Sequence, residues 1–587
     1  MRNTLFFFAL AFFLAFAACT SETKDNDQPD WKHNDNTVRV RLSADVTSLN
    51  PFLVRGSWDR TAYELLFQYP MDFDRKTLEL LPQTVKAPPT VEEISDGPYK
   101  GGQRYTYEFY DEAVWDDGRP VTGHDVEFSL KTIFNPNLPT QGFANFLELI
   151  REVQVDAQNP KKFSILTDRH YLLADAAIGN ITILPAHIYD PEGLTKDISF
   201  KEMRDANPDK LAGNKKLKKF AEAFASPKYG REVVSGSGPY KLTDWIDQQR
   251  IVFTKKENWW GDKLAAQNPM LHAYPDTIVM IPIKDQTAAM TALKGEQVDV
   301  LTEVDSKLFV DERDKGFLNK TYDFQTPPRP AFFYIAMQNR NPKLADKRVR
   351  NALARIIDVD EIIRDLYNGL GTRTVGPFPP TQKYYHKGLE PIKMDLAKAK
   401  ELLAEAGWTD TNNNGTVDKN INGKLTEMEL EFFYTPGLTF GENLTELFKN
   451  NAKKVGINIK RTKVESNVLR TKLRNGDYEL APWGAGLPAG IPDDPKPMFH
   501  TGGANPNGGN YTRFGNAQSD ALIEAIRNEM DEAKRNDLYR QFQEIIYEEQ
   551  PMIFLFVALN RVIVHKRFDA VYTMMTPGVD LQHLKLK

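Results

Sequence analysis

The sequence predicts an α/β protein with more than one domain. Segments with apolar residues at every second position, typical of strands, alternate along the chain with segments whose apolar residues recur every three or four positions, typical of helices. The chain has 587 residues, of which 41% are apolar. A chain of that length exceeds the usual size of one hydrophobic core, so we expect roughly two to four domains.

The strands and helices of the first half follow one another closely. Residues 37–42 alternate between apolar and basic side chains and are expected to form a strand. A second strand is expected at 105–110, an Asp-Gly turn at 116–118, and a helix at 125–133 with Asp125 in its first turn. Further strands are expected at 251–254, 277–282 and 297–301, and a further helix at 286–293.

The second half is richer in helices. Residues 344–366 and 395–406 carry apolar side chains at helical spacing, and Gly407 is placed to end the second of these helices. Residues 520–549 show the same spacing over a longer distance, and a strand is expected at 425–433. Alternating strands and helices favour sheets covered by helices.

The N-terminus has the pattern of an export signal. Arg2 is followed by an apolar run over residues 5–16, and the small residues Ala17 and Ala18 come directly before Cys19, the only cysteine in the chain. This is the layout of a secretory signal peptide, and the run is shorter than the ~20 residues of a permanent membrane helix. The position of Cys19 resembles a bacterial lipobox, in which the cysteine is lipidated. An ordinary secreted protein with one incidental cysteine is the alternative.

Residues 1–18 are therefore expected to form a signal peptide and residues 19–36 a flexible tether, because the latter are too polar and charged to bury a core. We expect the protein in the cell envelope, lipid-anchored, on the periplasmic face or on the cell surface. A net charge of −5 gives no basic face for nucleic acid, so no nucleic-acid partner is expected.

One polar loop has the spacing of a calcium site. Asp410, Asn412, Asn414 and Asp418 match the first, third, fifth and ninth positions of an EF-hand loop, and are candidate metal ligands. The twelfth position, which should be a bidentate glutamate, is Ile421. A polar hairpin turn is the alternative interpretation.

Catalytic motifs are missing from the sequence. It contains no G-x-S-x-G or H-E-x-x-H motif, and its nine histidines have no metal-ligand spacing. Glu303 and Asp305 could form a glycosidase pair, but a chain with 80 acidic residues contains such pairs by chance. We expect no catalytic residues and no cofactor, with a secreted hydrolase as the alternative from another class.

Four longer segments together carry the functional signal. They are FYDEAVWDDGRPVTGHDVEFSL at 109–130, GSGPYKLTDW with KKENWW within 235–260, FFYIAMQNRNPKLADKRVRNALA within 329–354, and NYTRFGNAQSDALIEA with LYRQFQEIIYEEQP within 510–551. In this order they resemble the extracellular solute-binding proteins of family 5, the peptide- and nickel-binding receptors of ABC importers.

The resemblance implies a two-lobed, periplasmic-binding-protein-like fold of type II, with an extra domain inserted in lobe one. Lobe one would consist of residues 37–60, 226–326 and 553–587. The inserted domain would be residues 61–225, and lobe two residues 327–552. The prolines at 327, 328 and 330 suit a hinge, because proline stiffens a crossing segment and gives up ladder hydrogen bonds. A simple surface loop is the alternative for this stretch.

A ligand cleft between the lobes is the second implication, since such a cleft needs aromatic walls and convergent polar groups. The candidate ligand-binding residues near the expected crossings are Arg55, Gly56, Trp58, Thr302, Glu303, Phe333, Tyr334, Trp483 and Gly484. For Trp58, an ordinary core position is the alternative.

Gly486 departs from the family pattern. Peptide-binding members carry an Asp three residues after the matching Trp, and this carboxylate pairs with the peptide α-ammonium. A buried ammonium needs such a partner, so Asp493 and Asp494 are candidates to replace it. A plain turn before Pro495 is the alternative interpretation of these two residues.

The resulting hypothesis is a monomeric, lipid-anchored receptor that captures an oligopeptide-like ligand by hinge closure and delivers it to an ABC permease and its ATPase. Because Gly486 removes the ammonium partner, an oligosaccharide, an opine or a metal chelate stays open as the ligand. A surface lipoprotein that passes its ligand to an outer-membrane transporter is a further alternative.

Overall fold

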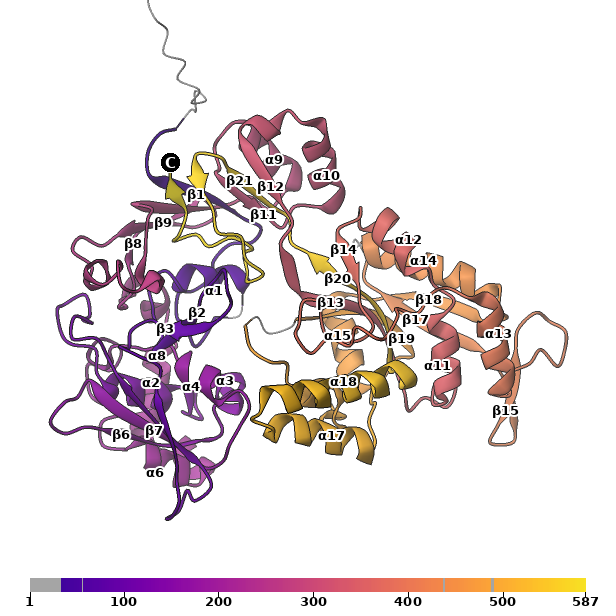
Figure 1. The fold of residues 1–587 in the computed structure, drawn as a ribbon, viewed down its shortest axis with the longest axis horizontal. Helices are drawn as coiled ribbons and strands as arrows, with labels where there is room; N and C mark the ends of the chain where they lie inside the picture. Colours follow the sequence, from indigo (N-terminus) through magenta and orange to yellow (C-terminus); the bar gives the residue numbers. More distant parts are fainter. Residues whose placement is uncertain (1–32, 55, 437–438, 487–489) are drawn as a thin grey trace, which may run out of the picture.

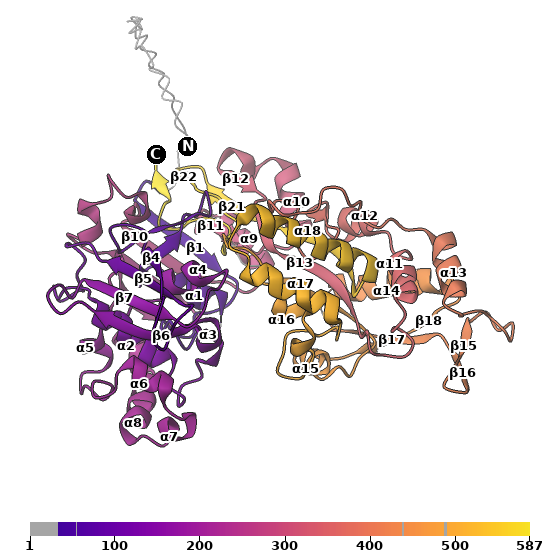
Figure 2. The ribbon, with the colours of Figure 1, turned by 60° about the horizontal axis from the view of Figure 1, so that its bottom comes forward.

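The computed structural model describes residues 33–587 except 55, 437–438 and 487–489. The expected signal peptide, Cys19 and most of the expected tether lie outside these residues. Three large sheets organise the chain (Figure 1). A seven-stranded and a four-stranded sheet lie in one body, and a six-stranded sheet lies in a second body beside it (Figures 1 and 2).

The seven-stranded sheet is built from strands far apart in the sequence. Its strands, in spatial order, are β12 (Tyr322–Gln325), β21 (Val562–His565), β11 (Val300–Thr302), β1 (Thr37–Leu42), β10 (Thr277–Pro282), β9 (Arg250–Lys255) and β8 (Tyr240–Ile246). β1 is parallel to β10 and β11, and the remaining pairs are antiparallel. The predicted strands at 37–42 and 277–282 are confirmed with these bounds.

The inserted domain contains an antiparallel four-stranded sheet. Its order is β4 (Thr90–Glu93), β5 (Gln103–Glu108), β7 (Lys162–Thr167) and β6 (Ile150–Val155). The domain follows α1 (Ser57–Tyr63). Its other elements are β2 (Met71–Phe73), β3 (Leu80–Pro82), α2 (Gly123–Ile133), α3 (Gln141–Phe146), α4 (Ala174–Gly179), α5 (Ala186–Tyr189), α6 (Phe200–Asp205), α7 (Pro208–Ala212) and α8 (Lys215–Phe224). The predicted helix at 125–133 is confirmed as α2, which begins two residues earlier because Thr122 and Asp125 form a capping box.

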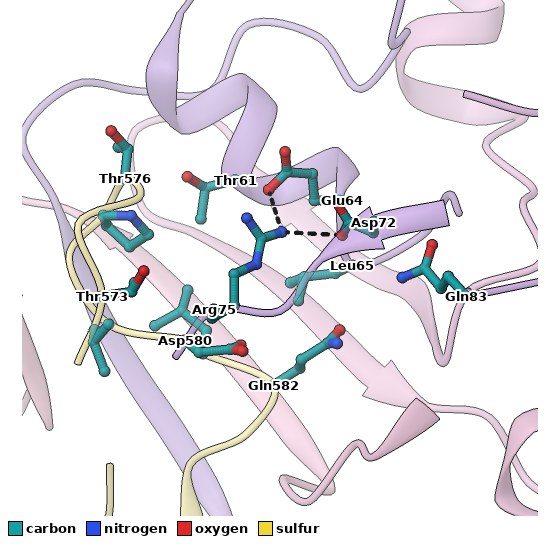
Figure 3. Close-up of a pocket in the computed structure, with 13 residues that line it drawn as sticks. Thr61, Glu64, Leu65, Asp72, Arg75, Gln83, Thr573, Thr576, Asp580 and Gln582 are labelled. Carbon is teal, nitrogen blue, oxygen red and sulfur yellow. Dashed lines mark hydrogen bonds and ion pairs between the residues drawn. The ribbon is translucent and has the colours of Figure 1, made fainter. Parts of the chain in front are cut away.

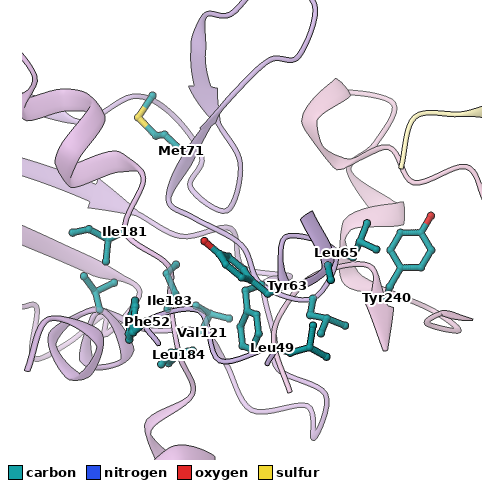
Figure 4. Packing of buried hydrophobic residues seen from close by; sticks show 14 of the residues in the cluster. Leu49, Phe52, Tyr63, Leu65, Met71, Val121, Ile181, Ile183, Leu184 and Tyr240 are labelled. Atoms are coloured by element: carbon teal, nitrogen blue, oxygen red, sulfur yellow. The ribbon is translucent and has the colours of Figure 1, made fainter. Parts of the chain in front are cut away.

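One continuous core joins the inserted domain to the seven-stranded sheet. Val38 and Val40 of β1 belong to the same buried cluster as Leu130 of α2 and Phe163 of β7. Figure 4 shows part of this cluster, where side chains from several segments pack together. Because residues of both sheets belong to one buried cluster, we describe them together as one body, which we call lobe one.

The six-stranded sheet forms lobe two. Its order is β14 (Gly371–Arg373), β20 (Met552–Leu559), β13 (Pro328–Met337), β19 (Leu480–Gly486), β17 (Glu429–Tyr434) and β18 (Asn458–Lys463). One face packs against α11 (Lys347–Ala354), α13 (Leu396–Glu405) and α14 (Thr439–Lys453), and the other against α15 (Ser466–Asn475), α17 (Ala517–Asn528) and α18 (Glu532–Glu549). Successive residues of β13 alternate between the two clusters, as strand geometry requires.

Two predicted helices are divided in the structure. The expected helix at 344–366 breaks after α11, and a new turn, α12 (Val359–Glu361), begins where the Asp358 side chain accepts a hydrogen bond from the Glu361 N–H at 3.0 Å. The expected helix at 520–549 is α17 and α18, because Asp531 caps the start of the second. Aspartate at a cap competes with helix continuation, which apolar periodicity does not reveal.

The expected strand at 425–433 is also divided. It becomes β16 (Lys424–Glu427), which forms a hairpin with β15 (Asp418–Ile421), and β17 in the large sheet. The remaining helices are α9 (Gln286–Lys294) and α10 (Ser306–Lys315) in lobe one, and α16 (Lys496–Phe499) in lobe two. As far as residues 33–587 are described, every helix is too short or too polar to span a bilayer.

The chain crosses between the lobes at two adjacent places. β12 leads into β13 at residues 326–327, and β20 leads into β21 at residues 560–561. The two crossings lie side by side, because Pro328 pairs with Leu559 and the Asn560 N–H donates to the Pro327 carbonyl at 2.8 Å. The prolines expected in a hinge are therefore at a crossing.

The sheets suggest different domain boundaries from those expected. Residues 553–559 were expected in lobe one, but as β20 they pair with β13 and β14 in lobe two. The expected boundary at 60/61 falls inside α1. We therefore propose 328–559 for lobe two, and a start for the inserted domain after α1.

Candidate functional site

Half of the candidate site lies at one edge of the seven-stranded sheet. Because β1 is parallel to β10 and β11, the carboxyl ends of all three strands lie at the same edge. Open α/β sheets bind ligands at such an edge, outside the carboxyl ends of the strands. Figure 1 shows α1 beside this edge, on the side of lobe one that faces lobe two. The residues that follow the three strand ends are Ser43, Ile283 and Glu303.

Arg41 fixes the geometry of the edge. Its side chain is fully buried and donates to the carbonyls of Ile283 at 2.7 Å, Thr302 at 3.0 Å and Lys284 at 3.3 Å. Burial lowers the pKa of the Arg41 guanidinium, and the nearby charge of Glu303 opposes that shift. One side chain from β1 thus holds the ends of β10 and β11 in place.

A chain of hydrogen bonds positions Glu303. Trp58 Nε1 donates to Ser43 Oγ at 2.9 Å, and Ser43 Oγ donates in turn to Glu303 Oε2. Glu303 is exposed and has a φ of 56°, in the left-handed region that non-glycine residues rarely adopt. The Trp58 ring packs in the core, while its indole N–H donates to Ser43 at the sheet edge.

Thr302 and Gly56 contribute their backbone to this half. Thr302 is buried, and its carbonyl is one of the acceptors of Arg41. The Gly56 N–H donates to Asp59 Oδ2 at 3.0 Å, and a Cβ at Gly56 would lie 2.7 Å from that oxygen. The third predicted residue of this segment, Arg55, lies outside the described residues.

The other half of the site lies at the end of β19 in lobe two. Trp483 is half-buried; the Tyr511 ring meets it edge to face at 6.2 Å between centroids, and the Arg470 guanidinium lies 5.5 Å from its ring centroid. Gly484 is exposed, and a Cβ there would lie 3.3 Å from the Phe333 ring. The strand therefore carries the Trp483 ring on one face, and on the other face the Gly484 backbone lies close to the Phe333 ring.

An aromatic wall continues from Gly484 on the second face. The Phe333 ring centroid lies 5.9 Å from that of Phe440 and 6.0 Å from that of Tyr367. All three rings are half-buried. Such a partly exposed aromatic surface suits stacking against an apolar or planar ligand.

Tyr334 does not take part, although it was predicted to. It is 2% exposed and belongs to the core beneath α15, α17 and α18. Phe333 and Tyr334 are consecutive in β13, so they must face opposite sides of the sheet. Phe333 is half-buried on the face covered by α11, α13 and α14, whereas Tyr334 is buried on the face covered by α15, α17 and α18.

Gly486 stands in open space. It pairs with Ala331 of β13 and is exposed. A Cβ added to Gly486 would meet no described atom within 4 Å. The backbone position could therefore accept a side chain, and the described part of this strand end supplies no carboxylate.

Asp493 is buried away from the strand end. It is 3% exposed, and its carboxylate accepts a hydrogen bond from the Tyr384 hydroxyl at 2.5 Å. The Tyr539 hydroxyl donates to its backbone carbonyl, and the two tyrosine rings stack with centroids 4.1 Å apart. Burial raises the pKa of Asp493 to about 7, although the Tyr384 hydrogen bond opposes the shift. Its environment is therefore that of a core carboxyl.

Asp494 joins the two lobes. Its Oδ2 accepts from Arg527 Nε at 3.0 Å and from the hydroxyl of Tyr171, in the inserted domain, at 3.2 Å. The next residue, Leu172, donates its N–H to the Arg527 carbonyl at 3.3 Å. We call the contact of Tyr171, Asp494 and Arg527 the clasp. The two acids predicted to replace a missing carboxylate are thus both engaged elsewhere.

The candidate calcium loop satisfies its own carboxylates. Asp410 accepts from the N–H groups of Asn414 and Gly415, while Asp418 is 1% exposed and accepts from Thr411. In the described part of the chain, no group of three or more acidic, His or Cys side chains is placed to hold a metal ion.

A charged pocket in lobe one lies behind the sheet edge (Figure 3). Arg75 lies 3.4 Å from both Glu64 and Asp72, and the C-terminal segment covers it through Asp580 and Gln582. The carboxylate of Asp580 in turn contacts His583 at 2.6 Å. Arg75 Nη1 also donates to Met575 Sδ of the C-terminal segment at 3.0 Å, which gives the pocket a structural role.

Residues 95–509 match the family model of bacterial extracellular solute-binding proteins, family 5 Middle. The chain belongs to this family. It is 24% identical to the oligopeptide-binding protein AppA of Bacillus subtilis over 80% of this chain and 78% of that protein. It is 23% identical to heme-binding protein A of Haemophilus influenzae over 92% of this chain and 91% of that protein.

Solved structures of similar proteins share the fold of this solute-binding protein. AppA from Bacillus subtilis in complex with a nonapeptide aligns with a TM-score of 0.68 at 21% identity, covering 94% of this chain and 99% of that one. NikA from Brucella suis in complex with Fe(III)-EDTA aligns with a TM-score of 0.72 at 18% identity, covering 94% and 100%. The predicted two-lobed α/β fold of type II is confirmed.

Sequence reasoning missed several residues of the site, among them Arg41, Ser43, Tyr171, Phe440 and Tyr511. Arg41 could have been predicted from the sequence, because a central parallel strand is buried on both faces and a charged side chain within it needs internal partners. The others depend on contacts between segments far apart in the chain, which periodicity does not report.

Proposed function

We propose that this protein is the solute receptor of an ABC importer and holds an oligopeptide-like ligand between its two lobes. One observation carries the proposal. Two sheet edges, one with Trp58, Ser43 and Glu303 and the other with Trp483 and Phe333, belong to two lobes between which the described chain crosses at two adjacent places. Ligand sites commonly combine aromatic walls with a few polar groups at such domain interfaces.

Closure of the lobes would couple binding to delivery. A ligand that contacts both edges does so only when the lobes are closed, so its binding shifts the population toward the closed state. The paired crossings at Pro327 and Asn560 support a hinge motion, because few bonds need to change there. The permease would then select the closed, loaded form.

A non-peptide ligand is the second candidate, and Gly486 favours it. The described end of β19 has no carboxylate for an α-ammonium, whereas Phe333, Phe440 and Trp483 would stack equally well on a sugar, an opine or a metal chelate. The relatives named above differ in this respect, since one is named for oligopeptides and one for heme. A hydrolase remains the candidate from another class.

The test is thermal unfolding of the purified protein with a tetrapeptide pool, an oligosaccharide pool and nickel–histidine. Bound ligand at a hundredfold excess over Kd should raise the unfolding free energy by about 2.7 kcal/mol. Stabilisation by the peptide pool alone would support the peptide receptor, and stabilisation by another set would assign that class. Turnover of the stabilising compound, followed by mass spectrometry, would contradict a pure binding role.

We further propose that the mature protein is a monomer anchored in the cell envelope through lipid on Cys19, with a permease and its ATPase as partners. The apolar run before Cys19 and the polar segment after it support this proposal. Metabolic labelling with palmitate should mark the wild-type protein but not Cys19→Ala. A protein surface-labelled on intact cells would favour hand-over to an outer-membrane transporter instead.

A further inference from the structure

Glu303 is exposed, and its carboxylate forms no ion pair with a described lysine, arginine or histidine. The charge of Glu303 acts on the buried Arg41 guanidinium, but Arg41 donates its hydrogen bonds to backbone carbonyls. Among the described residues, the Ser43 hydroxyl donates a hydrogen bond to the Glu303 carboxylate. An unpaired carboxylate in water costs nothing, but one that closing lobes would cover requires a positive partner.

The position of Glu303 is fixed from both sides. Ser43, held by the Trp58 indole, orients its carboxylate, and the Gln286 side chain donates to its carbonyl at 3.1 Å. The backbone of Glu303 lies in the left-handed region at a φ of 56°. Strained backbone of this kind is held by its surroundings and occurs preferentially at binding sites.

Three neighbouring acids of the same edge already accept backbone hydrogen bonds. Asp285 and Asp305 accept hydrogen bonds from the first N–H groups of α9 and α10 as helix caps. Asp59 accepts from the N–H groups of Thr47 and Gly56. Glu303 differs from these three aspartates, because its carboxylate oxygens can still accept hydrogen bonds from a ligand.

The segment around Glu303 touches lobe two. The carbonyl of Val304 accepts a hydrogen bond from Arg561 at the second crossing, and Ser306 Oγ accepts from Asn368 Nδ2 of lobe two at 2.9 Å. The residue before Asn368 is Tyr367, one ring of the aromatic wall. The aromatic wall of lobe two therefore adjoins a residue that contacts the Glu303 segment.

We propose that Glu303 binds an ammonium group of the ligand, with Ser43 and Trp58 as positioning residues. The proposal rests on the proposed receptor function and adds that the positive end of the ligand is held by lobe one. A charge-assisted hydrogen bond that becomes buried on closure supplies both affinity and orientation. An ammonium anchor in lobe one makes a carboxylate at Gly486 unnecessary.

The experiment compares two tetrapeptide pools that differ only at the N-terminus, one free and one acetylated, both amidated at the C-terminus. Titration calorimetry and thermal shift are measured on the wild type and on Glu303→Gln. We expect the free pool to bind the wild type at least ten times more tightly than the acetylated pool. Glu303→Gln should lose roughly 10- to 100-fold for the free pool, and little for the acetylated pool.

Two further variants provide a second test of the proposal and a matched control. Ser43→Ala leaves the carboxylate but removes its orienting donor, so an intermediate loss of free-pool affinity is expected. Glu222→Gln, at an exposed glutamate of α8 in the inserted domain, is the matched control and should bind as the wild type.

The outcomes separate the two proposals. Equal loss for both pools, or unchanged free-pool binding by Glu303→Gln and Ser43→Ala, would overturn the role of Glu303 and leave the peptide receptor standing. Binding of neither pool to the wild type would overturn the peptide receptor and this inference together.

Discussion

The hydroxyl of Tyr171 donates to Asp494 at 3.2 Å across the boundary between the lobes, and Arg527 holds the same carboxylate at 3.0 Å. The Arg527 guanidinium also lies 5.2 Å from the Tyr171 ring centroid. Burial raises the pKa of Tyr171 to about 12, and the Asp494 charge adds to the rise, so the phenol stays a donor at neutral pH. The lobes are therefore linked by side chains as well as by the two crossing segments.

Tyr171→Phe should weaken ligand binding without unfolding the protein. Loss of one hydrogen bond that exists only with the lobes together shifts the closed state by about 0.5–1.5 kcal/mol, or up to roughly tenfold in Kd. Small-angle scattering should show a larger radius of gyration for the ligand-free variant. Tyr274→Phe, a lobe-one tyrosine that packs against His272 and His583, is the control. An unchanged radius and Kd would show that the clasp does not bias closure.

Gly486→Asp should create a second ammonium anchor. The added side chain has open space, and a carboxylate at the end of β19 would pair with a free peptide N-terminus. We expect roughly tenfold tighter binding of free-amine peptides by calorimetry. The same change at Gly484 is the control, because its Cβ would press on Phe333 at 3.3 Å and lower stability instead. Identical effects of the two substitutions would speak against an open position.

Asp493 should make stability fall as the pH rises. Its folded pKa of about 7 is above the ordinary value of 3.8, so the folded state binds the proton more tightly than the unfolded state. The contribution is fully present below about pH 4 and is lost by about pH 7, by a few kcal/mol at most. Urea unfolding of Asp493→Asn should lack this decline, whereas Glu222→Gln should keep it. Parallel curves for Asp493→Asn and wild type would refute the assignment.

Arg75→Met should be strongly destabilising. Removing this side chain leaves Glu64 and Asp72 without their shared cation in a buried pocket, which costs about 3–5 kcal/mol. Arg60→Met is the control, since Arg60 also pairs with Glu64 but has a side chain that is 56% exposed, where ion pairs contribute about 1 kcal/mol or less. Urea midpoints of the two variants give the comparison, and equal losses would contradict it.

Local patterns predicted the elements better than the contacts between them. The strand over Thr37–Leu42 followed from alternation alone, because the pattern is set by one face of a pleated strand. The breaks after α11 and α17 did not, because Asp358 and Asp531 act as caps through their side chains rather than through apolarity. The expected boundaries put residues 553–559 in lobe one, whereas β20 pairs with β13 and β14 in lobe two, since a run of apolar residues fits the centre of either sheet.

The candidate site shows the same limit. Phe333 and Tyr334 are equivalent in the sequence, and only the helices covering each face of β13 separate an edge residue from a core residue. The sequence around Asp493, two aspartates before a proline, is typical of a turn, but the stacked rings of Tyr384 and Tyr539 bury this residue. The hydrogen bonds from Trp58 to Ser43 and from Ser43 to Glu303 join three segments of the chain, so no local sequence pattern could predict them.

The C-terminal strands have a consequence for how the protein is made. β20 lies between β14 and β13 in one sheet, and β21 lies between β12 and β11 in the other. Both sheets therefore lack an interior strand until residues 552–565 have been synthesised. Contacts of such long sequence separation form late and slowly. Neither large sheet can therefore be completed until translation is nearly finished.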